Sequence, residues 1–215
     1  MVFRTDLAVE ARELLEKDIG GTDYFTQRYG DVTLTRLKIK TPEAAGKMGK
    51  PEGTYLTFDV PPFSDDFRDP AARIELIGKE LASLLPQRGL ILVAGLGNTE
   101  ITPDNLGPKT AKGVLATRHI TGELARSTGL DDLRPVAVLA PGVLGQTGIE
   151  TGELLYSVTQ KLRPAALIVV DALGLPKAGS SGAVPSRYRI QGSARDQGWE
   201  TPGLKSTVRL WEYRW

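Results

Sequence analysis

At residues 90–98 the sequence reads LILVAGLGN, and this stretch decides the fold class of the 215-residue chain. Its first five residues are apolar, without any alternation of apolar and polar positions. This pattern is typical of a strand buried on both faces, as in a parallel sheet covered by helices. The glycines and the asparagine that follow are typical of a tight turn. We therefore predict a buried parallel strand with a polar loop at its carboxyl end.

Two further apolar runs extend the sheet, VAVL at 136–139 and AALIVV at 165–170. Helical patterns over 105–120 and 149–162 separate the three strands. Strands that alternate with helices are typical of parallel sheets with right-handed crossovers. The predicted fold class is α/β, with three layers and a mostly parallel sheet flanked by helices.

The remainder of the chain shows weaker patterns. We predict helices over 5–17 and 70–84 and strands over 32–39 and 54–60. Residues 41–53, rich in Pro, Gly and Lys, favour a surface loop. Residues 174–215 show neither the helical nor the strand period. The prediction is a single α/β domain over 1–173, followed by a tail.

The composition excludes several classes of function. The 27 basic and 26 acidic residues leave a net charge of +1, so no overall field attracts nucleic acid or an anionic membrane. The chain has no cysteine, which excludes disulfides, thiol nucleophiles and thiolate metal sites. Its apolar runs are far shorter than the about 20 residues that span a bilayer. We expect a cytoplasmic protein that binds neither nucleic acid nor membranes.

Three polar segments follow the predicted parallel strands. In open α/β sheets, ligands bind beyond the carboxyl ends of the strands, so these segments form the predicted site. Two of them contain the acids Asp104 and Asp171. The other candidates are small or polar loop residues: Gly97, Asn98 and Thr102 after the first strand, and Gly145, Thr147 and Gly148 after the second.

Each acid also has a structural explanation. Thr102, Pro103 and Asp104 together form a common helix start, because the helix dipole favours a carboxylate in the first turn. Asp171 at the end of a buried strand is also explained as the cap of the next loop. From the residues alone, both explanations stay open.

Two familiar kinds of site are disfavoured. The GLG at 95–97 lacks the third glycine of a dinucleotide-binding loop. His119 is the only histidine, which excludes a multi-histidine metal site, and no Gly-x-Ser-x-Gly motif supplies a serine nucleophile for it. We expect His119 to be an ordinary helix residue, and Arg118 and Arg126 to be solvated.

Four blocks of the sequence occur in a characteristic order. They are RTDLAVE at 4–10, GLGNTEITPDNLGP at 95–108 with ATRH at 116–119, PGVLGQTGIETGE at 141–153, and VVDAL at 169–173. Together they resemble the germination protease family of spore-forming bacteria. The resemblance implies an atypical aspartic endopeptidase that degrades small acid-soluble spore proteins, with Asp104 and Asp171 as catalytic acids and no cofactor. It also implies a fold like that of hydrogenase-maturation endopeptidases.

The resemblance implies further properties of maturation and assembly. Family members act in the forespore and spore core, and the resemblance implies a homo-oligomer, a tetramer. They are made as zymogens that trim their own N-termini at a site like those in their substrates. DLAVE at 6–10 fits such a site, so the resemblance implies self-cleavage between Asp6 and Leu7, with 1–6 as the propeptide.

The resemblance ends near Leu173. Family members continue with segments such as RLCSTVQISDTGISPGSGVGN and, later, TLGVPV. The tail can be translated back into codons, with each third base chosen among those that the genetic code allows for that residue. In a shifted frame, each new codon then joins the third base of one codon to the first two bases of the next. Residues 189–201 then read DTGISPGSGVGN, and 209–215 read TLGVPV. We therefore expect 174–215 to be an aberrant tail produced by a frameshift.

Two alternatives to this function stay open. A metal-dependent endopeptidase of the hydrogenase-maturation type would use Asp104 and Asp171 as metal ligands, with His119 as the only available imidazole. Alternatively, the chain is an inactive, truncated homologue.

Overall fold

The computed structural model describes residues 19–60, 70–130, 132–172, 188–195 and 206–214. The chain divides into two compact units. Residues 85–172 and 197–209 form the first, here called the parallel unit. Residues 1–84, 173–196 and 210–215 form the second, the antiparallel unit. The predicted helix over 5–17 and the residues Asp6 and Leu7 lie outside the described residues, and the single domain over 1–173 stays a prediction.

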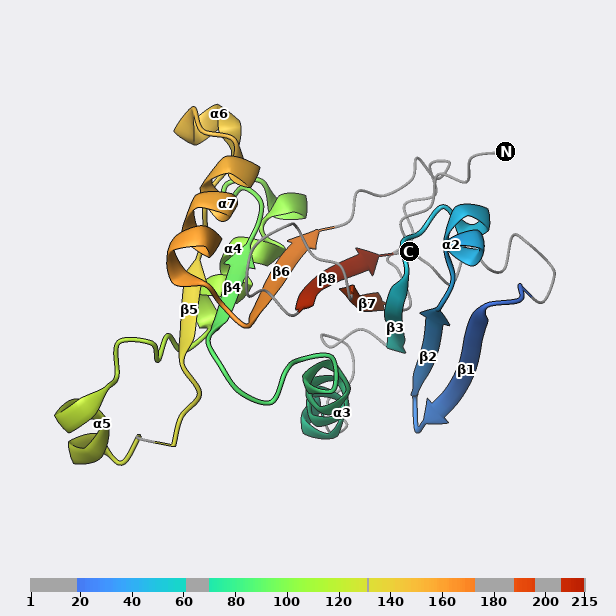
Figure 1. The fold of residues 1–215 in the computed structure, drawn as a ribbon, viewed down its shortest axis with the longest axis horizontal. Coiled ribbons are helices and arrows are strands. Elements are labelled where there is room, and N and C mark those ends of the chain that lie inside the picture. The colour runs from blue at the N-terminus through green and yellow to red at the C-terminus, as the bar shows by residue number, and fades with distance from the viewer. Residues whose placement is uncertain (1–18, 61–69, 131, 173–187, 196–205, 215) are drawn as a thin grey trace. The chain divides into compact units, whose positions relative to one another are not determined.

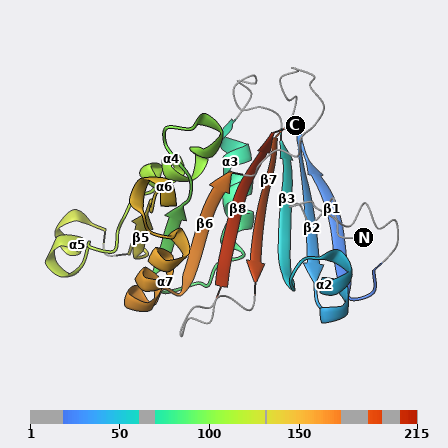
Figure 2. The same cartoon turned by 90° about the horizontal axis from the view of Figure 1, so that it is seen from above.

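The parallel unit is built on β4 (Ile91–Gly95), β5 (Val136–Leu139) and β6 (Ala166–Ala172). The strand β4 lies in the middle and pairs in parallel with both of the others (Figures 1 and 2). All five residues of β4 are buried. This confirms the three predicted strands and the α/β class, because only a central strand between two helical layers loses both faces to solvent.

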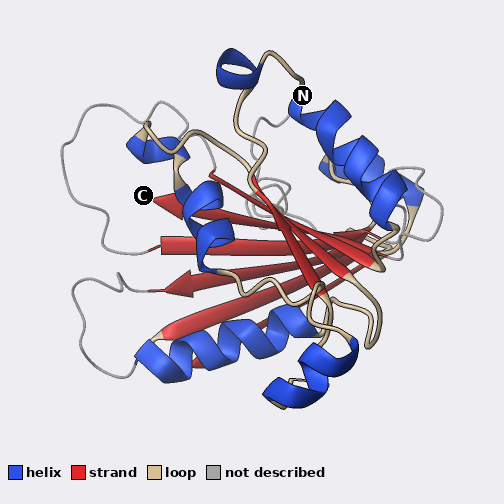
Figure 3. Cartoon of the chain, turned by 90° about the vertical axis from the view of Figure 1, so that its left-hand side faces the viewer, coloured by secondary structure: helices blue, strands red, loops and turns tan. Residues whose placement is uncertain are grey.

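Helices cover both faces of this small sheet (Figure 3). On one face, α7 (Thr151–Leu162) packs against alternate residues of β4 and β6 through Leu155. On the other, α4 (Leu106–Gly113) lies against the same two strands, where Ala111 approaches Gly95. The parallel unit therefore has the predicted three layers.

The predicted helix over 105–120 is too long, because it ends at Gly113. The N–H groups of residues 117 and 118 both donate to the carbonyl oxygen of Val136, at 3.0 and 2.9 Å. These bonds to the start of β5 take the place of further helical bonds. His119 consequently lies in an exposed turn, so its prediction as a helix residue is wrong.

Two short helices of the parallel unit have no counterpart in the prediction, α5 (Gly122–Thr128) and α6 (Leu144–Thr147). Both end at a glycine in the left-handed conformation, Gly129 at φ 67° and Gly148 at φ 68°. Helices of seven and four residues are too short to show a periodic apolar face.

The antiparallel unit contains a different kind of sheet. Its strands are β1 (Thr22–Tyr29), β2 (Val32–Ile39), β3 (Gly53–Val60) and β7 (Tyr188–Arg195), each antiparallel to its neighbour. The turn at Gly30 and Asp31 joins β1 to β2, and a two-residue turn allows only antiparallel pairing. The predicted strands over 32–39 and 54–60 are confirmed. The prediction of a mostly parallel sheet therefore holds for the parallel unit and is wrong for these four strands.

Residues 41–53 contain a helix where their composition predicts a loop. The helix α2 (Pro42–Met48) begins after Thr41, whose Oγ1 accepts a hydrogen bond from the N–H of Ala44. It ends at Gly49, which has φ 60°. Met48 is buried against the strands, and this packing outweighs the local preference for a loop.

The helix α3 (Pro70–Ala82) confirms the predicted helix, which ends two residues earlier than expected. Its apolar residues Leu76, Ile77 and Leu81 pack against the core formed by β2 and β3. Arg73 of α3 is buried, and its Nε donates to Oδ1 of Asp31 at 3.3 Å. This ion pair joins α3 to the β1–β2 turn.

The tail contains two strands where the sequence predicts no regular element. One is β7, which pairs with β3 so that Tyr188 lies opposite Val60. The other is β8 (Ser206–Arg214). A strand depends strongly on its pairing partner, so it can form without a clear pattern of its own.

Within the described ranges, no helix combines the length and the apolar character needed to cross a membrane.

Candidate functional site

The carboxyl ends of β4 and β6 are fixed by a close approach of backbone to backbone. A Cβ atom on Gly107 would lie 2.1 Å from the carbonyl oxygen of Leu96 and 2.6 Å from that of Val170. A Cβ atom on Gly95 would lie 2.0 Å from the carbonyl oxygen of Gly107. The N–H of Leu96 donates to the carbonyl oxygen of Val170 at 2.8 Å, which continues the strand pairing beyond β4. The start of α4 therefore lies directly against both strand ends.

Asp104 is held just before α4, at the end of the 3-10 turn η1 (Thr102–Asp104). The N–H of Asn98 donates to Oδ2 of Asp104 at 2.7 Å and to its carbonyl oxygen at 3.1 Å. The carboxylate also lies close to Gly97, since a Cβ atom there would be 3.0 Å from its Oδ1. The half-buried Asp104 is thus oriented by the backbone of the loop after β4.

The prediction of Thr102 as a helix cap is wrong. The turn η1 starts after the extended residue Ile101, and no side chain caps it. Thr102 is exposed. Asp104 does lie in the first turn, as the structural explanation requires, but its carboxylate accepts a hydrogen bond from the preceding loop.

Asp171 lies inside β6 as its penultimate residue and not in the loop after it. Its Oδ1 accepts a hydrogen bond from the N–H of the next residue, Ala172, at 2.9 Å. The turn η1 lies beside β6. The structure therefore places both acids on neighbouring elements, at the edge where the parallel strands end.

The loop after β5 reaches the same place through α6. Nε2 of Gln146 donates to Oδ1 of Asn98 at 2.9 Å, and the N–H of Glu100 donates to the same oxygen at 2.9 Å. The predicted loop residues Gly145 and Thr147 flank Gln146 and are exposed. Gly148 ends the helix with its left-handed backbone. The sequence prediction did not include Gln146 among the site residues, although it is the long amide side chain in this glycine-rich loop.

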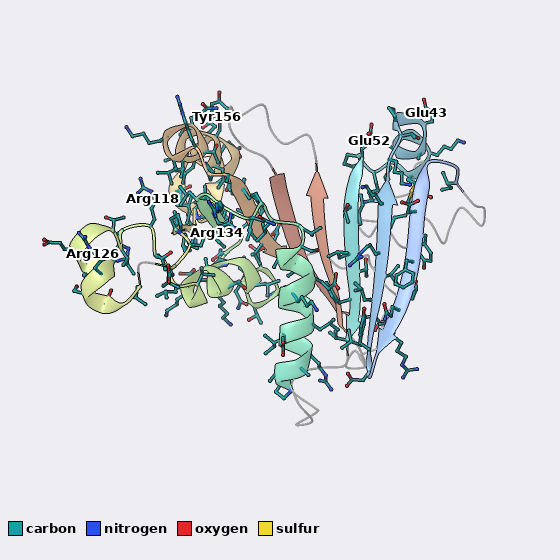
Figure 4. The ribbon with its side chains drawn as sticks, turned by 60° about the horizontal axis from the view of Figure 1, so that its bottom comes forward. Glu43, Glu52, Arg118, Arg126, Arg134 and Tyr156 are labelled. Carbon is teal, nitrogen blue, oxygen red and sulfur yellow. The ribbon has the colours of Figure 1, made fainter. Side chains whose placement is uncertain are left out.

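Three basic residues discussed above, Arg118, His119 and Arg126, lie at the surface. Arg126 is on α5 and Arg118 is in the preceding loop, and both are exposed, as predicted (Figure 4). His119 is exposed beside Arg118. In the part of the chain that the structure describes, no three His, Cys, Asp or Glu side chains gather in a group that could hold a metal ion.

The contact between Gly97 and Asp104 predicts that alanine is not tolerated at residue 97. Gly97 has φ 122°, which costs an alanine about 1–3 kcal/mol, and the new Cβ atom would lie 2.0 Å from the carbonyl oxygen of Asp104. We expect Gly97→Ala to lower the urea midpoint of unfolding clearly. The matched control is Gly145→Ala, because no atom lies within 4 Å of a Cβ atom there and the residue is helical. Equal midpoints for the two variants would contradict this geometry.

Known proteins resemble this chain over most of its length. The family model of the germination protease matches residues 3–179. The germination protease of Clostridium acetobutylicum is 37% identical over 82% of this chain and 57% of its own length. That of Caldanaerobacter subterraneus subsp. tengcongensis is 38% identical over 80% of this chain and 54% of its own. That of Bacillus cereus is 36% identical over 79% and 49%. The chain spans about half the length of the curated relatives that it matches, and both kinds of match lead to the same conclusion: it belongs to the germination protease family.

Proposed function

We propose that this protein is an aspartic-type endopeptidase that begins the degradation of small acid-soluble spore proteins during germination. The proposal rests on the position of Asp104 and Asp171, two acids on the neighbouring elements η1 and β6 at the carboxyl edge of a parallel sheet. This edge is where open α/β sheets bind ligands. The name that its relatives share, germination protease, supports peptide hydrolysis as the reaction.

The chemistry follows from two carboxyl groups in one site. In the proposed mechanism, one carboxyl group acts as the base and the other as the acid. The ionised member takes a proton from water, which attacks the peptide carbonyl. The protonated member gives its proton to the leaving amine as the C–N bond breaks. The reaction consumes one water molecule and needs no cofactor.

The proposal predicts the effect of removing either acid. Asp104→Asn and Asp171→Asn should each lower the rate of cleavage of an acid-soluble spore protein by at least about 100-fold, the usual contribution of a general acid or base. The exposed Asp132→Asn is the matched control and should keep the wild-type rate. Cleavage is followed by gel electrophoresis and folding by circular dichroism.

Two outcomes of this experiment decide against the proposal. Cleavage that survives both substitutions would exclude the aspartate mechanism. A folded wild-type chain that cleaves no acid-soluble spore protein would show an inactive homologue.

The metal-dependent alternative has no observation in its favour. His119 lies in an exposed turn, and the described residues contain no group suited to a metal ion.

The likeness to the fold of hydrogenase-maturation endopeptidases stays part of our proposal. It is supported by the three parallel strands between α4 and α7.

Maturation by self-cleavage is also part of the proposal, together with a homo-oligomer that acts in the spore core. DLAVE at 6–10 has the acidic–apolar pattern of a cleavage site, so activation should remove residues 1–6. Mass spectrometry after activation should show a chain that begins at Leu7, and Asp104→Asn should keep Met1. An activated wild-type enzyme with Met1 intact would contradict self-cleavage.

The native mass of the same sample gives the number of chains in the assembly, and a single chain would contradict the oligomer.

We also propose that residues 174–215 are translated out of frame. The family motifs that appear in the shifted frame, at 189–201 and 209–215, support this origin. Resequencing of the gene around the codon of Leu173 should find a missing or extra base. The same uninterrupted frame in several isolates would refute the frameshift.

A further inference from the structure

The side-chain amides of Asn98 and Gln146 form a short chain of hydrogen bonds that ends at Asp104. Nε2 of Gln146 donates to Oδ1 of Asn98 at 2.9 Å. The backbone N–H of the same asparagine donates to Oδ2 of Asp104 at 2.7 Å. The loop after β5 is thus joined to a carboxylate that lies 42 residues earlier in the sequence, through one intermediate residue.

The side chain of Asn98 adds a further restraint on its peptide group, beside the two bonds of its N–H to Asp104. Gly97 has φ 122°, and as a glycine it has no side chain to restrict its backbone conformation. The peptide group between Gly97 and Asn98 carries the N–H that reaches Asp104. Oδ1 of Asn98 accepts two hydrogen bonds, from the N–H of Glu100 and from Gln146. The first belongs to the same loop, so among the residues that the structure describes, Gln146 alone ties this oxygen to a different loop.

Gln146 lies in a loop whose backbone is held by hydrogen bonds of the neighbouring residue Thr147. Oγ1 of Thr147 donates to the carbonyl oxygen of Val143 at 3.2 Å and accepts from the N–H of Ile149 at 3.2 Å. A Cβ atom on Gly142 would lie 3.6 Å from Oε1 of Gln146, so the loop backbone passes close to this side chain. These bonds hold the backbone on both sides of Gln146, whose exposed side chain reaches Asn98.

A hydrogen bond between exposed side chains contributes little to folding, because water replaces it readily and the side chains lose rotamer freedom. In a catalytic site, such a hydrogen bond has a larger effect on the orientation of the reacting groups than on folding, because those groups must keep a fixed geometry. We propose that Gln146 is a positioning residue, which holds Asn98 so that its backbone N–H orients the Asp104 carboxylate toward the scissile peptide. This inference rests on the proposed aspartate mechanism.

The test separates positioning from a general structural role. Gln146→Ala should lower kcat about 10-fold and leave KM within about two-fold, since only the geometry of the reacting group changes. Asn98→Ala should lower kcat similarly. The double variant should be no slower than Asn98→Ala alone, because Gln146 acts through Asn98. Asn98→Asp keeps an oxygen that accepts both hydrogen bonds and should recover part of the rate. The control is Gln27→Ala, an exposed glutamine of β1.

A second measurement does not depend on catalysis. In Gln146→Ala, the backbone amide of Asn98 should exchange its hydrogen faster than in the wild-type chain, because its bond to Asp104 is weakened. The amide of Ala94, buried in β4, should exchange at an unchanged rate. Nuclear magnetic resonance resolves the two amides.

The outcomes distinguish this inference from the proposed function. Full activity of Asp104→Asn would overturn the aspartate mechanism. An inactive Asp104→Asn together with wild-type kcat in Gln146→Ala would overturn only the positioning role. Additive effects in the double variant would also overturn it, and so would unchanged exchange at Asn98, which decides the question even in a chain without activity.

Discussion

The contact of Gly107 with the carboxyl ends of β4 and β6 is the constraint on which the site depends. The helix α4 starts against the carbonyl oxygens of Leu96 and Val170, at a distance that leaves no room for a side chain. Because η1 immediately precedes α4, this contact also fixes the position of Asp104. A larger residue at Gly107 would push the start of α4 away from the strands and would move the turn with it. The arrangement of the acids is therefore a consequence of packing between backbones.

Backbone groups also hold the two carboxylates. Asp104 accepts a hydrogen bond from the N–H of Asn98, and Asp171 accepts one from the N–H of Ala172. Backbone donors are fixed by the strands and loops to which they belong, so they orient an acid without the rotamer freedom of a second side chain. The loop after β5 adds a side-chain link, from Gln146 to Asn98. The loops that follow β4 and β5 thus meet at the edge of the sheet where β6 carries Asp171, as open α/β sheets lead one to expect.

The elements that the sequence predicted well are those with a strong local signal. The apolar runs of β4, β5 and β6 need two covered faces, and this need is visible in the residues themselves. The errors occur where distant residues compete with a local pattern. The helix predicted over 105–120 stops at Gly113, since the following residues bond to Val136. In the same way, burial of Met48 turns a loop-like composition into α2.

By itself, the sequence determined the α/β class, the three parallel strands and the presence of two acids where two of those strands end. Buried strands and strand-end loops have compositions that can be read without any partner, and four ordered blocks were enough to indicate the family. Only the tertiary structure decided that Thr102 caps no helix, that His119 lies in a turn, and that Gln146 reaches Asn98. Those features depend on atoms of residues up to 48 positions apart. A local sequence pattern does not indicate contacts over such a separation, because they are set by how the elements pack.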